Sequence, residues 1–170
     1  KGVEKKDSGD IYIGAGTVFS HITADPVIQE CIPVLGEAVD QVGGPQIRNI
    51  GTIGGNICKG AVSADSVPTV FSYNALLKIA NAEGGRTVPV REFYLGPGRV
   101  DLHPGEVLTH VIIPRAEYEG YHGHYIKYSM RNAMDIATLS CSVVSRIDSA
   151  KNILEDVRIT FGVAAPVPYR

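Results

Sequence analysis

The residues best suited to chemistry lie in one glycine-rich stretch at positions 46–58. Gly54 and Gly55 have no side chains, so a ligand can approach the backbone closely there, and consecutive free N–H groups can cradle an anion. Side chains of the kinds that bind a polyol or a phosphate accompany them. These are a hydroxyl, an amide and a carboxylate: Thr52, Asn56 and Asp65. The stretch therefore predicts one wall of a nucleotide-cofactor site.

Two other groups of polar residues carry weaker signals. His122 and His124 would share one face of a strand, but two imidazoles without a nearby carboxylate or thiol cluster make a weak metal site. The glycine between them favours a turn instead. Arg131 and Asp135, four residues apart, fit either a salt bridge that shapes a loop or a contact with a cofactor.

A glycine motif near the start of the chain has part of a dinucleotide-binding fingerprint. Gly14 and Gly16 follow a predicted strand at positions 11–13, but Phe19 stands where the third glycine of the fingerprint belongs. No acidic residue suited to a ribose hydroxyl is evident downstream. A Rossmann-type NAD-binding domain is therefore disfavoured, and a turn before a short helix is the expected structure.

Helices are predicted in the first half of the chain. Asp25 is an N-cap candidate with proline after it, and apolar residues recur with helical spacing up to position 42. Pro33 should divide this run into a short helix and a longer one, because proline lacks the N–H that a helix interior needs. Gly43 and Gly44 should then end the second helix.

Strands are predicted in the second half. Leu77 and Ile79, then Val88 and Val90, suggest a hairpin across positions 82–86, and further strands end near position 113 and cover positions 121–129. Apolar and polar residues alternate over 139–147 and 157–163, which indicates an antiparallel sheet that is polar on one face. The order of elements predicts an α+β fold, with N-terminal short helices packed on a mainly antiparallel sheet.

The composition is that of an ordinary globular protein. The 170 residues are 44% apolar and 20% charged, enough for one core or two small lobes. A net charge of −2 gives no electrostatic footprint for nucleic acid, and no apolar stretch reaches the roughly 20 residues of a transmembrane helix. Three widely spaced cysteines favour free thiols in a reducing compartment, and hence the cytoplasm: Cys31, Cys58 and Cys141.

Several motifs together resemble the FAD-binding medium subunit of molybdenum hydroxylases. The resemblance is collinear over nearly the whole chain and is greatest to the flavoprotein of bacterial xanthine dehydrogenases, with carbon monoxide and nicotinate dehydrogenase flavoproteins as relatives. The segments that carry it are Gly-Pro-Gln-Ile-Arg-Asn at 44–49, Thr-Ile-Gly-Gly-Asn-Ile-Cys at 52–58, Ser-Ala-Asp at 63–65, Gly-Pro-Gly at 96–98, the strand at 108–114, Lys-Tyr-Ser-Met-Arg at 127–131, Met-Asp-Ile-Ala at 134–137 and Gly-Val-Ala-Ala-Pro at 162–166.

The resemblance implies which residues contact FAD, and it implies no catalytic acid or base. Asp65 would accept hydrogen bonds from cofactor hydroxyls, although it is also a candidate N-cap for a helix at 66–73. Lys127 would lie near the flavin ring and stabilise the negative charge of the reduced flavin, whereas an isolated lysine on a strand is more often solvated. The positions implied to bind the cofactor are Val42, Thr52, Ile53, Gly54, Gly55, Asn56, Asp65, Leu108 and Lys127.

The resemblance also implies an assembly. FAD would lie between two lobes, of which residues 1–170 match the second, while the upstream lobe with its glycine-rich pyrophosphate loop and the family's C-terminal domain would be absent. In the complex, electrons would pass from a molybdenum-cofactor large subunit through the 2Fe-2S clusters of a small subunit to FAD, and then to NAD or another acceptor. The chain would be one component of an FAD-dependent oxidoreductase, inactive alone, and a different subunit would select the substrate, a purine or related heterocycle.

The missing pyrophosphate loop leaves a second class of function open. The chain would then be a non-catalytic docking module that assembles with partner subunits and has little affinity for FAD by itself.

Overall fold

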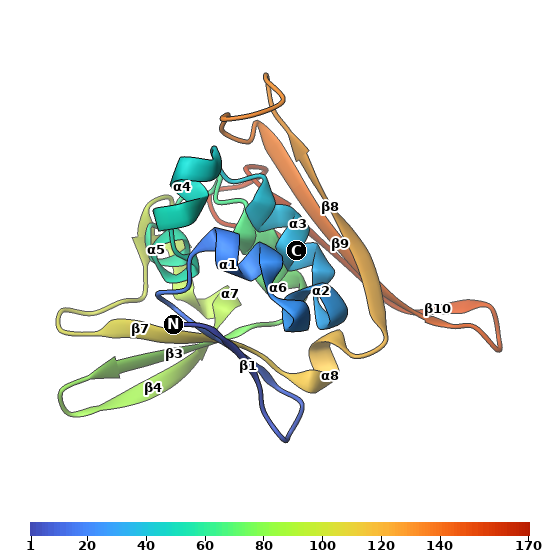
Figure 1. The fold of residues 1–170 in the computed structure, drawn as a ribbon, viewed down its shortest axis with the longest axis horizontal. Helices are drawn as coiled ribbons and strands as arrows, with labels where there is room; N and C mark the ends of the chain where they lie inside the picture. The colour runs from blue at the N-terminus through green and yellow to red at the C-terminus, as the bar shows by residue number, and fades with distance from the viewer.

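The computed structural model describes residues 1–170, which form two main antiparallel sheets with a layer of short helices between them (Figure 1). The predicted α+β class, with short helices on antiparallel sheets, is confirmed. The first sheet has the order β1-β2-β7-β3-β4, the second has the order β10-β9-β8, and β5 and β6 form a separate hairpin. The strand bounds are β1 Val3–Lys5, β2 Ile11–Gly14, β3 Leu76–Asn81, β4 Gly84–Pro89, β5 Tyr94–Gly96, β6 Arg99–Val100, β7 Val107–Ile113, β8 Tyr121–Tyr128, β9 Leu139–Asp148 and β10 Ile153–Gly162.

The helices are all short, and none has the length and apolar character needed to cross a membrane. Helices α3 and α6 pack on the second sheet, while α5 packs on β7 of the first. The helix bounds are α1 Phe19–Ala24, α2 Pro26–Cys31, α3 Pro33–Asp40, α4 Pro45–Ile50, α5 Ile53–Cys58, α6 Ser66–Ser72, α7 Val90–Phe93 and α8 Arg115–Tyr118.

The predicted break in the helical run is confirmed. Asp25 caps α2, since its Oδ1 accepts a hydrogen bond from the backbone N–H of Val27 at 3.0 Å. Pro33 begins α3, where its missing N–H costs no hydrogen bond. Helix α3 ends at Asp40, and Gly43 then turns the chain with a φ of +50°, which glycine adopts at little cost.

One apolar band runs across the first sheet. Val111 of β7 lies opposite Ile13 of β2 on one side and Leu77 of β3 on the other, and Leu77 lies opposite Val88 of β4. All four side chains are buried, so the band forms the apolar face of the sheet on which the helices pack. The predicted hairpin is confirmed as β3–β4, except that Val90 begins α7 instead of continuing the strand.

The second sheet turns its polar face inward. Apolar residues of the outer face are 40–44% exposed at Leu139, Val157 and Ile159. The hydroxyl of Ser72 in α6 donates a hydrogen bond to the Thr160 hydroxyl at 2.9 Å, which shows how closely the helix approaches the sheet. The buried polar residues that face the helices are Ser140, Ser142, Arg158 and Thr160. The alternation predicted the strands and a polar face, but this polar face is the buried one.

Strand β8 runs without interruption through both histidines, so the predicted turn at Gly123 is wrong. A side chain at Gly123 would collide with the carbonyl oxygen of Val143 in β9, and the glycine therefore serves close strand pairing. His124 instead contacts a carboxylate of α3, with 2.8 Å between its Nδ1 and Oε2 of Glu37.

Candidate cofactor site

The predicted glycine-rich loop is largely a helix. Thr52 is the N-cap of α5, and its hydroxyl accepts a hydrogen bond from the backbone N–H of Gly55 at 3.1 Å. Ile53 is fully buried and packs in the core, so its side chain does not reach a surface recess. The residues expected to cradle a ligand therefore form the first turns of a helix that stands on the first sheet.

Gly54 is held against the turn that follows β2. Its N–H donates to the carbonyl oxygen of Ala15 at 2.9 Å, so this N–H is not free to bind an anion. A Cβ at position 54 would lie 2.6 Å from the Cβ of Ala15. The absence of a side chain at Gly54 thus permits close packing of α5, whatever ligand lies nearby.

Two recesses adjoin α5. The first, which we call the α5 recess, has a volume of about 320 Å³ and includes four predicted residues: Thr52, Gly54, Gly55 and Leu108. The second, which we call the Asp65 recess, has a volume of about 240 Å³ and includes three: Val42, Asn56 and Asp65. Helix α5 supplies residues to both, so seven of the nine predicted positions lie around one helix.

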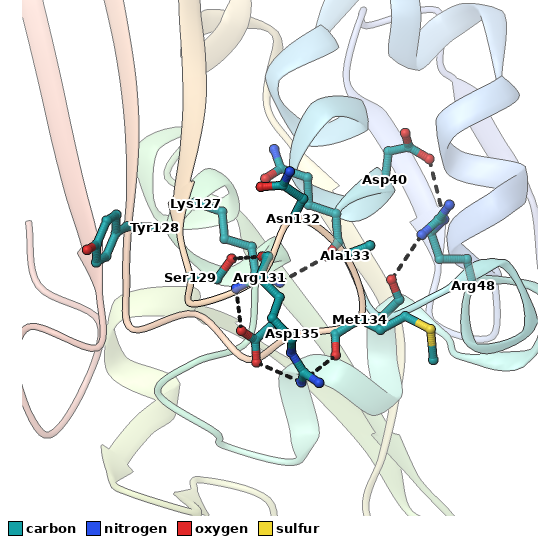
Figure 2. Close-up of a pocket in the computed structure, with 12 residues that line it drawn as sticks. Asp40, Arg48, Lys127, Tyr128, Ser129, Arg131, Asn132, Ala133, Met134 and Asp135 are labelled. Carbon is teal, nitrogen blue, oxygen red and sulfur yellow. Dashed lines mark hydrogen bonds and ion pairs between the residues drawn. The ribbon is translucent and has the colours of Figure 1, made fainter.

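A third and larger recess adjoins the second. This polar recess has a volume of about 560 Å³ and is lined by Lys127, Arg48, Asp40 and the loop after β8 (Figure 2). It shares Gly43, Met134 and Asp135 with the Asp65 recess. The predicted residues are therefore distributed over neighbouring recesses, with Lys127 in the third and Ile53 in none of the three.

Asp65 is buried and both of its carboxylate oxygens are bound. Oδ1 accepts a hydrogen bond from the Tyr125 hydroxyl at 2.8 Å, and Oδ2 lies 2.9 Å from Nζ of Lys127. Asp65 does occupy the N-cap position of α6, as the alternative expected, but its side chain makes no capping bond to the helix. Burial raises the pKa of Asp65, while the hydrogen bonds from Lys127 and Tyr125 act in the opposite direction.

Lys127 is not a solvated surface lysine. Its side chain is 6% exposed, and Nζ donates both to Asp65 and, at 2.9 Å, to the carbonyl oxygen of Gln41 at the end of α3. Because Gln41 precedes Val42, the lysine joins the two walls of the Asp65 recess. It also places a positive charge at the border of the polar recess.

The loop after β8 is shaped by Arg131 and Asp135. The Asp135 carboxylate accepts bonds from the backbone N–H of Arg131 at 2.9 Å and from its guanidinium at 3.1 Å (Figure 2). Arg131 holds the pKa of Asp135 below its ordinary value. Met134 has a φ of +54°, a strained conformation for a side chain, and the adjacent ion pair stabilises it. The salt-bridge interpretation of this pair is therefore confirmed.

Two site residues are absent from the sequence-based expectation. Tyr125 binds Asp65, and Ser66 donates its hydroxyl hydrogen to Oδ1 of Asn56 at 2.7 Å. Tyr125 had one available signal, because it stands two positions before Lys127 on the same face of a strand. Cys58 also lines the α5 recess, and burial raises the pKa of its thiol, so the thiol stays protonated at neutral pH.

Comparison with known proteins agrees with this geometry. Residues 1–116 match the family described as FAD binding domain in molybdopterin dehydrogenase. The chain is 40% identical over all 170 residues to the xanthine dehydrogenase FAD-binding subunit of Escherichia coli, and covers 58% of that protein. It is 32% identical to the carbon monoxide dehydrogenase medium chain of Hydrogenophaga pseudoflava, over 98% of this chain and 56% of the relative.

The fold agrees as well. A solved structure of carbon monoxide dehydrogenase from Hydrogenophaga pseudoflava, which lacks the Mo-pyranopterin moiety of its cofactor, superposes with a TM-score of 0.91 at 31% identity. The match covers the whole of this chain and 57% of that one, so the chain spans less than two thirds of the relatives it matches. On the family match and the shared fold, the chain belongs to the family of FAD-binding domains found in molybdopterin dehydrogenases.

Proposed function

We propose that this domain holds FAD in the flavoprotein component of a molybdenum hydroxylase of the xanthine dehydrogenase type. The observation that carries the proposal is Asp65, a buried carboxylate whose two oxygens are held in place and which lines a recess together with Val42 and Asn56. A carboxylate oxygen can accept more than one hydrogen bond, so it suits the hydroxyls of a ribityl chain or ribose. Membership of the family identifies the flavin dinucleotide that carries them.

The other residues around α5 fit the same cofactor. Val42 and Leu108 offer apolar surface to a ring, and the Thr52 hydroxyl keeps its own hydrogen to donate. Since the Gly54 N–H is already bound to Ala15, this helix offers few backbone donors to a pyrophosphate. We therefore infer that a glycine-rich loop from an upstream lobe binds the pyrophosphate, and that residues 1–170 form the second lobe of the site.

Bound FAD would supply electron transfer, taking electrons that reach it from a molybdenum-cofactor subunit through the iron–sulfur clusters of a small subunit and passing them to NAD or another acceptor. The side chains of this domain would bind and orient the cofactor. A purine or related heterocycle would be oxidised elsewhere in the complex, at the molybdenum-cofactor subunit.

A docking module without its own FAD affinity is the second candidate function. The outer face of β8–β10 favours it, because apolar side chains of Leu139, Val157 and Ile159 are exposed there. Such a face suits contact with another protein surface. Binding of FAD distinguishes the two candidates directly.

Titration of the intact flavoprotein with FAD, followed by flavin fluorescence, tests the proposal. We expect saturable binding that Asp65→Asn weakens about ten- to a hundredfold, because a charged acceptor of the cofactor hydroxyls is lost. Asp7→Asn, which makes the same change on the exposed β1–β2 turn, should leave the Kd unchanged. Absence of FAD binding in the wild-type protein would favour the docking module, and equal affinity for both variants would remove Asp65 from the site.

Replacement of Lys127 by methionine is expected to make the bound flavin harder to reduce. The change removes a buried cation and leaves the Asp65 carboxylate without its partner, so negative charge on the reduced flavin becomes less favourable. We expect the midpoint potential to fall by about 30 mV or more, equivalent to about 1.4 kcal/mol for two electrons. Reductive titration measures it, with the exposed Lys59→Met at the end of α5 as control. An unchanged potential would limit Lys127 to holding Asp65 and Gln41.

A further inference from the structure

Two residues of one strand donate hydrogen bonds to the Asp65 carboxylate. Tyr125 and Lys127 stand at alternate positions of β8, so both side chains point from the same face toward the start of α6. Each supplies one donor to a different carboxylate oxygen, at 2.8 Å and 2.9 Å. Helix α6 itself gives Asp65 no capping bond, so the orientation of the carboxylate is set by β8.

Strand β8 is in turn tied to α3. The backbone N–H of Tyr125 donates to Oε2 of Glu37 at 3.1 Å, and Nζ of Lys127 donates to the carbonyl oxygen of Gln41. The Tyr125 side chain is only 1% exposed and packs in the apolar core, so its hydroxyl has little freedom to move. The tyrosine is therefore a rigid donor whose hydroxyl touches the site only through Asp65.

We propose that Tyr125 is a positioning residue of the cofactor site, which fixes the Asp65 carboxylate so that its remaining lone pairs face the recess where cofactor hydroxyls bind. The proposal rests on the proposed function of Asp65. With the lysine alone, the carboxylate keeps rotational freedom, because the terminal torsion of an aspartate has a broad profile. A second donor on the other oxygen removes that freedom before the ligand arrives, which lowers the entropic cost of binding.

The electrostatics of the recess agree with this role. Burial alone raises the pKa of Asp65, and the two hydrogen bonds from β8 favour its ionised form. Asp135, the other carboxylate that lines the recess, is bound within its own loop by Arg131, whereas Asp65 is bound by the two donors of β8. Tyr125 is the uncharged donor of the two, so it directs the Asp65 carboxylate without neutralising it.

The test is a double-mutant cycle in the intact flavoprotein, with the Kd for FAD measured by flavin fluorescence. Tyr125→Phe keeps the ring and removes only the hydroxyl, and it should weaken binding about tenfold. In an Asp65→Asn background the same change should have almost no further effect, because coupled residues are not additive. Tyr118→Phe, which removes another buried hydroxyl whose partner is the carbonyl oxygen of Gly9, should leave the Kd within twofold.

The possible outcomes separate this proposal from the one on which it rests. If Asp65→Asn weakens binding and Tyr125→Phe does not, the positioning role is overturned while the FAD site stands. If Tyr125→Phe weakens binding equally in both backgrounds, its effect is a general loss of structure, which also overturns the role. If Asp65→Asn itself has no effect, the assignment of Asp65 to the FAD site fails, and the role of Tyr125 fails with it.

Discussion

Replacing Gly54 by valine is expected to destabilise the whole domain, in addition to any loss of FAD. A Cβ at this position would lie 2.6 Å from the Cβ of Ala15 and 2.7 Å from its carbonyl oxygen, and valine adds two methyl groups beyond that. The neighbouring backbone cannot easily shift, since Gly54 is bonded to Ala15 and the N–H of Ile53 to Thr17 at 3.1 Å. We expect the free energy of unfolding to fall by about 3 kcal/mol or more, at the upper end for overpacking in a rigid site.

Thermal unfolding of the FAD-free protein, followed by circular dichroism, measures this effect without any contribution from ligand binding. Gly55→Ala is the matched control, because Gly55 is exposed and the only close neighbour of an added Cβ is the Thr52 hydroxyl at 3.0 Å. We expect that control to change stability by less than about 1 kcal/mol. A Gly54→Val protein that melts like the wild type would contradict the packing account and return Gly54 to a role in ligand approach.

Helices and strands whose ends are set by residues close to them in the sequence could be predicted. The cap at Asp25, the break at Pro33 and the β3–β4 hairpin all follow from local signals, and the structure confirms them. The sequence does not predict helix α5, because two glycines lower its helix propensity and because the Thr52 hydroxyl also suits a ligand. The hydrogen bond from the Gly55 N–H to the Thr52 hydroxyl shows that a helix N-cap signal was present in the sequence. The same threonine also fitted a ligand-binding site, so the signal was ambiguous.

Contacts between distant parts of the chain could not be predicted in this way. Asp65 contacts Tyr125 and Lys127, which are 60 and 62 residues away in the sequence. No residue near Asp65 in the sequence indicates these partners. The resemblance to a known family pointed to Asp65 and Lys127 separately. Only the fold shows that they form one ion pair and that Tyr125 completes it.

The alternation of apolar and polar residues predicts a strand but does not show which of its two faces is buried. In β9 and β10 the hydroxyl residues face inward, where their small size lets α6 approach the sheet. Arg158 shares that inward face and is 7% exposed. A charged residue in a strand would ordinarily be assigned to solvent, so the sequence gives no signal for the ionic network around Arg158.

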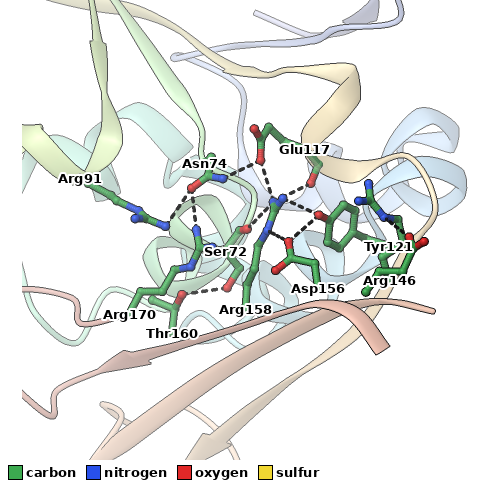
Figure 3. A network of polar contacts seen from close by, with 11 residues as sticks. Ser72, Asn74, Arg91, Glu117, Tyr121, Arg146, Asp156, Arg158, Thr160 and Arg170 are labelled. Atoms are coloured by element: carbon green, nitrogen blue, oxygen red, sulfur yellow. Dashed lines mark hydrogen bonds and ion pairs between the residues drawn. The ribbon is translucent and has the colours of Figure 1, made fainter. Parts of the chain in front are cut away.

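That network gives the second large expected effect. The Arg158 guanidinium lies 2.7 Å from carboxylate oxygens of both Asp156 and Glu117, and donates to the Tyr121 hydroxyl at 2.6 Å (Figure 3). It also donates to the carbonyl oxygen of Ser72 at 3.2 Å, so it joins β10 to β8, α8 and α6. Arg158→Met should lower the free energy of unfolding by about 3 kcal/mol, the low end for breaking a buried ion pair, because the Glu117 and Asp156 carboxylates left without a partner are 27% and 34% exposed.

Urea denaturation of the FAD-free protein measures the Arg158 effect, and Arg146→Met on the neighbouring strand provides the control. Arg146 pairs with Glu155 at 2.9 Å, but both side chains are about 40% exposed, so its removal should cost less than about 1 kcal/mol. Tyr121 and Arg158 hold the pKa of Asp156 below its ordinary 3.8, so the network stabilises the wild type above that pH. This contribution is lost as the pH falls through the lowered pKa, and Arg158→Met should lack much of it. Equal stability of the two variants would show that the second sheet is held by its apolar contacts and not by this arginine.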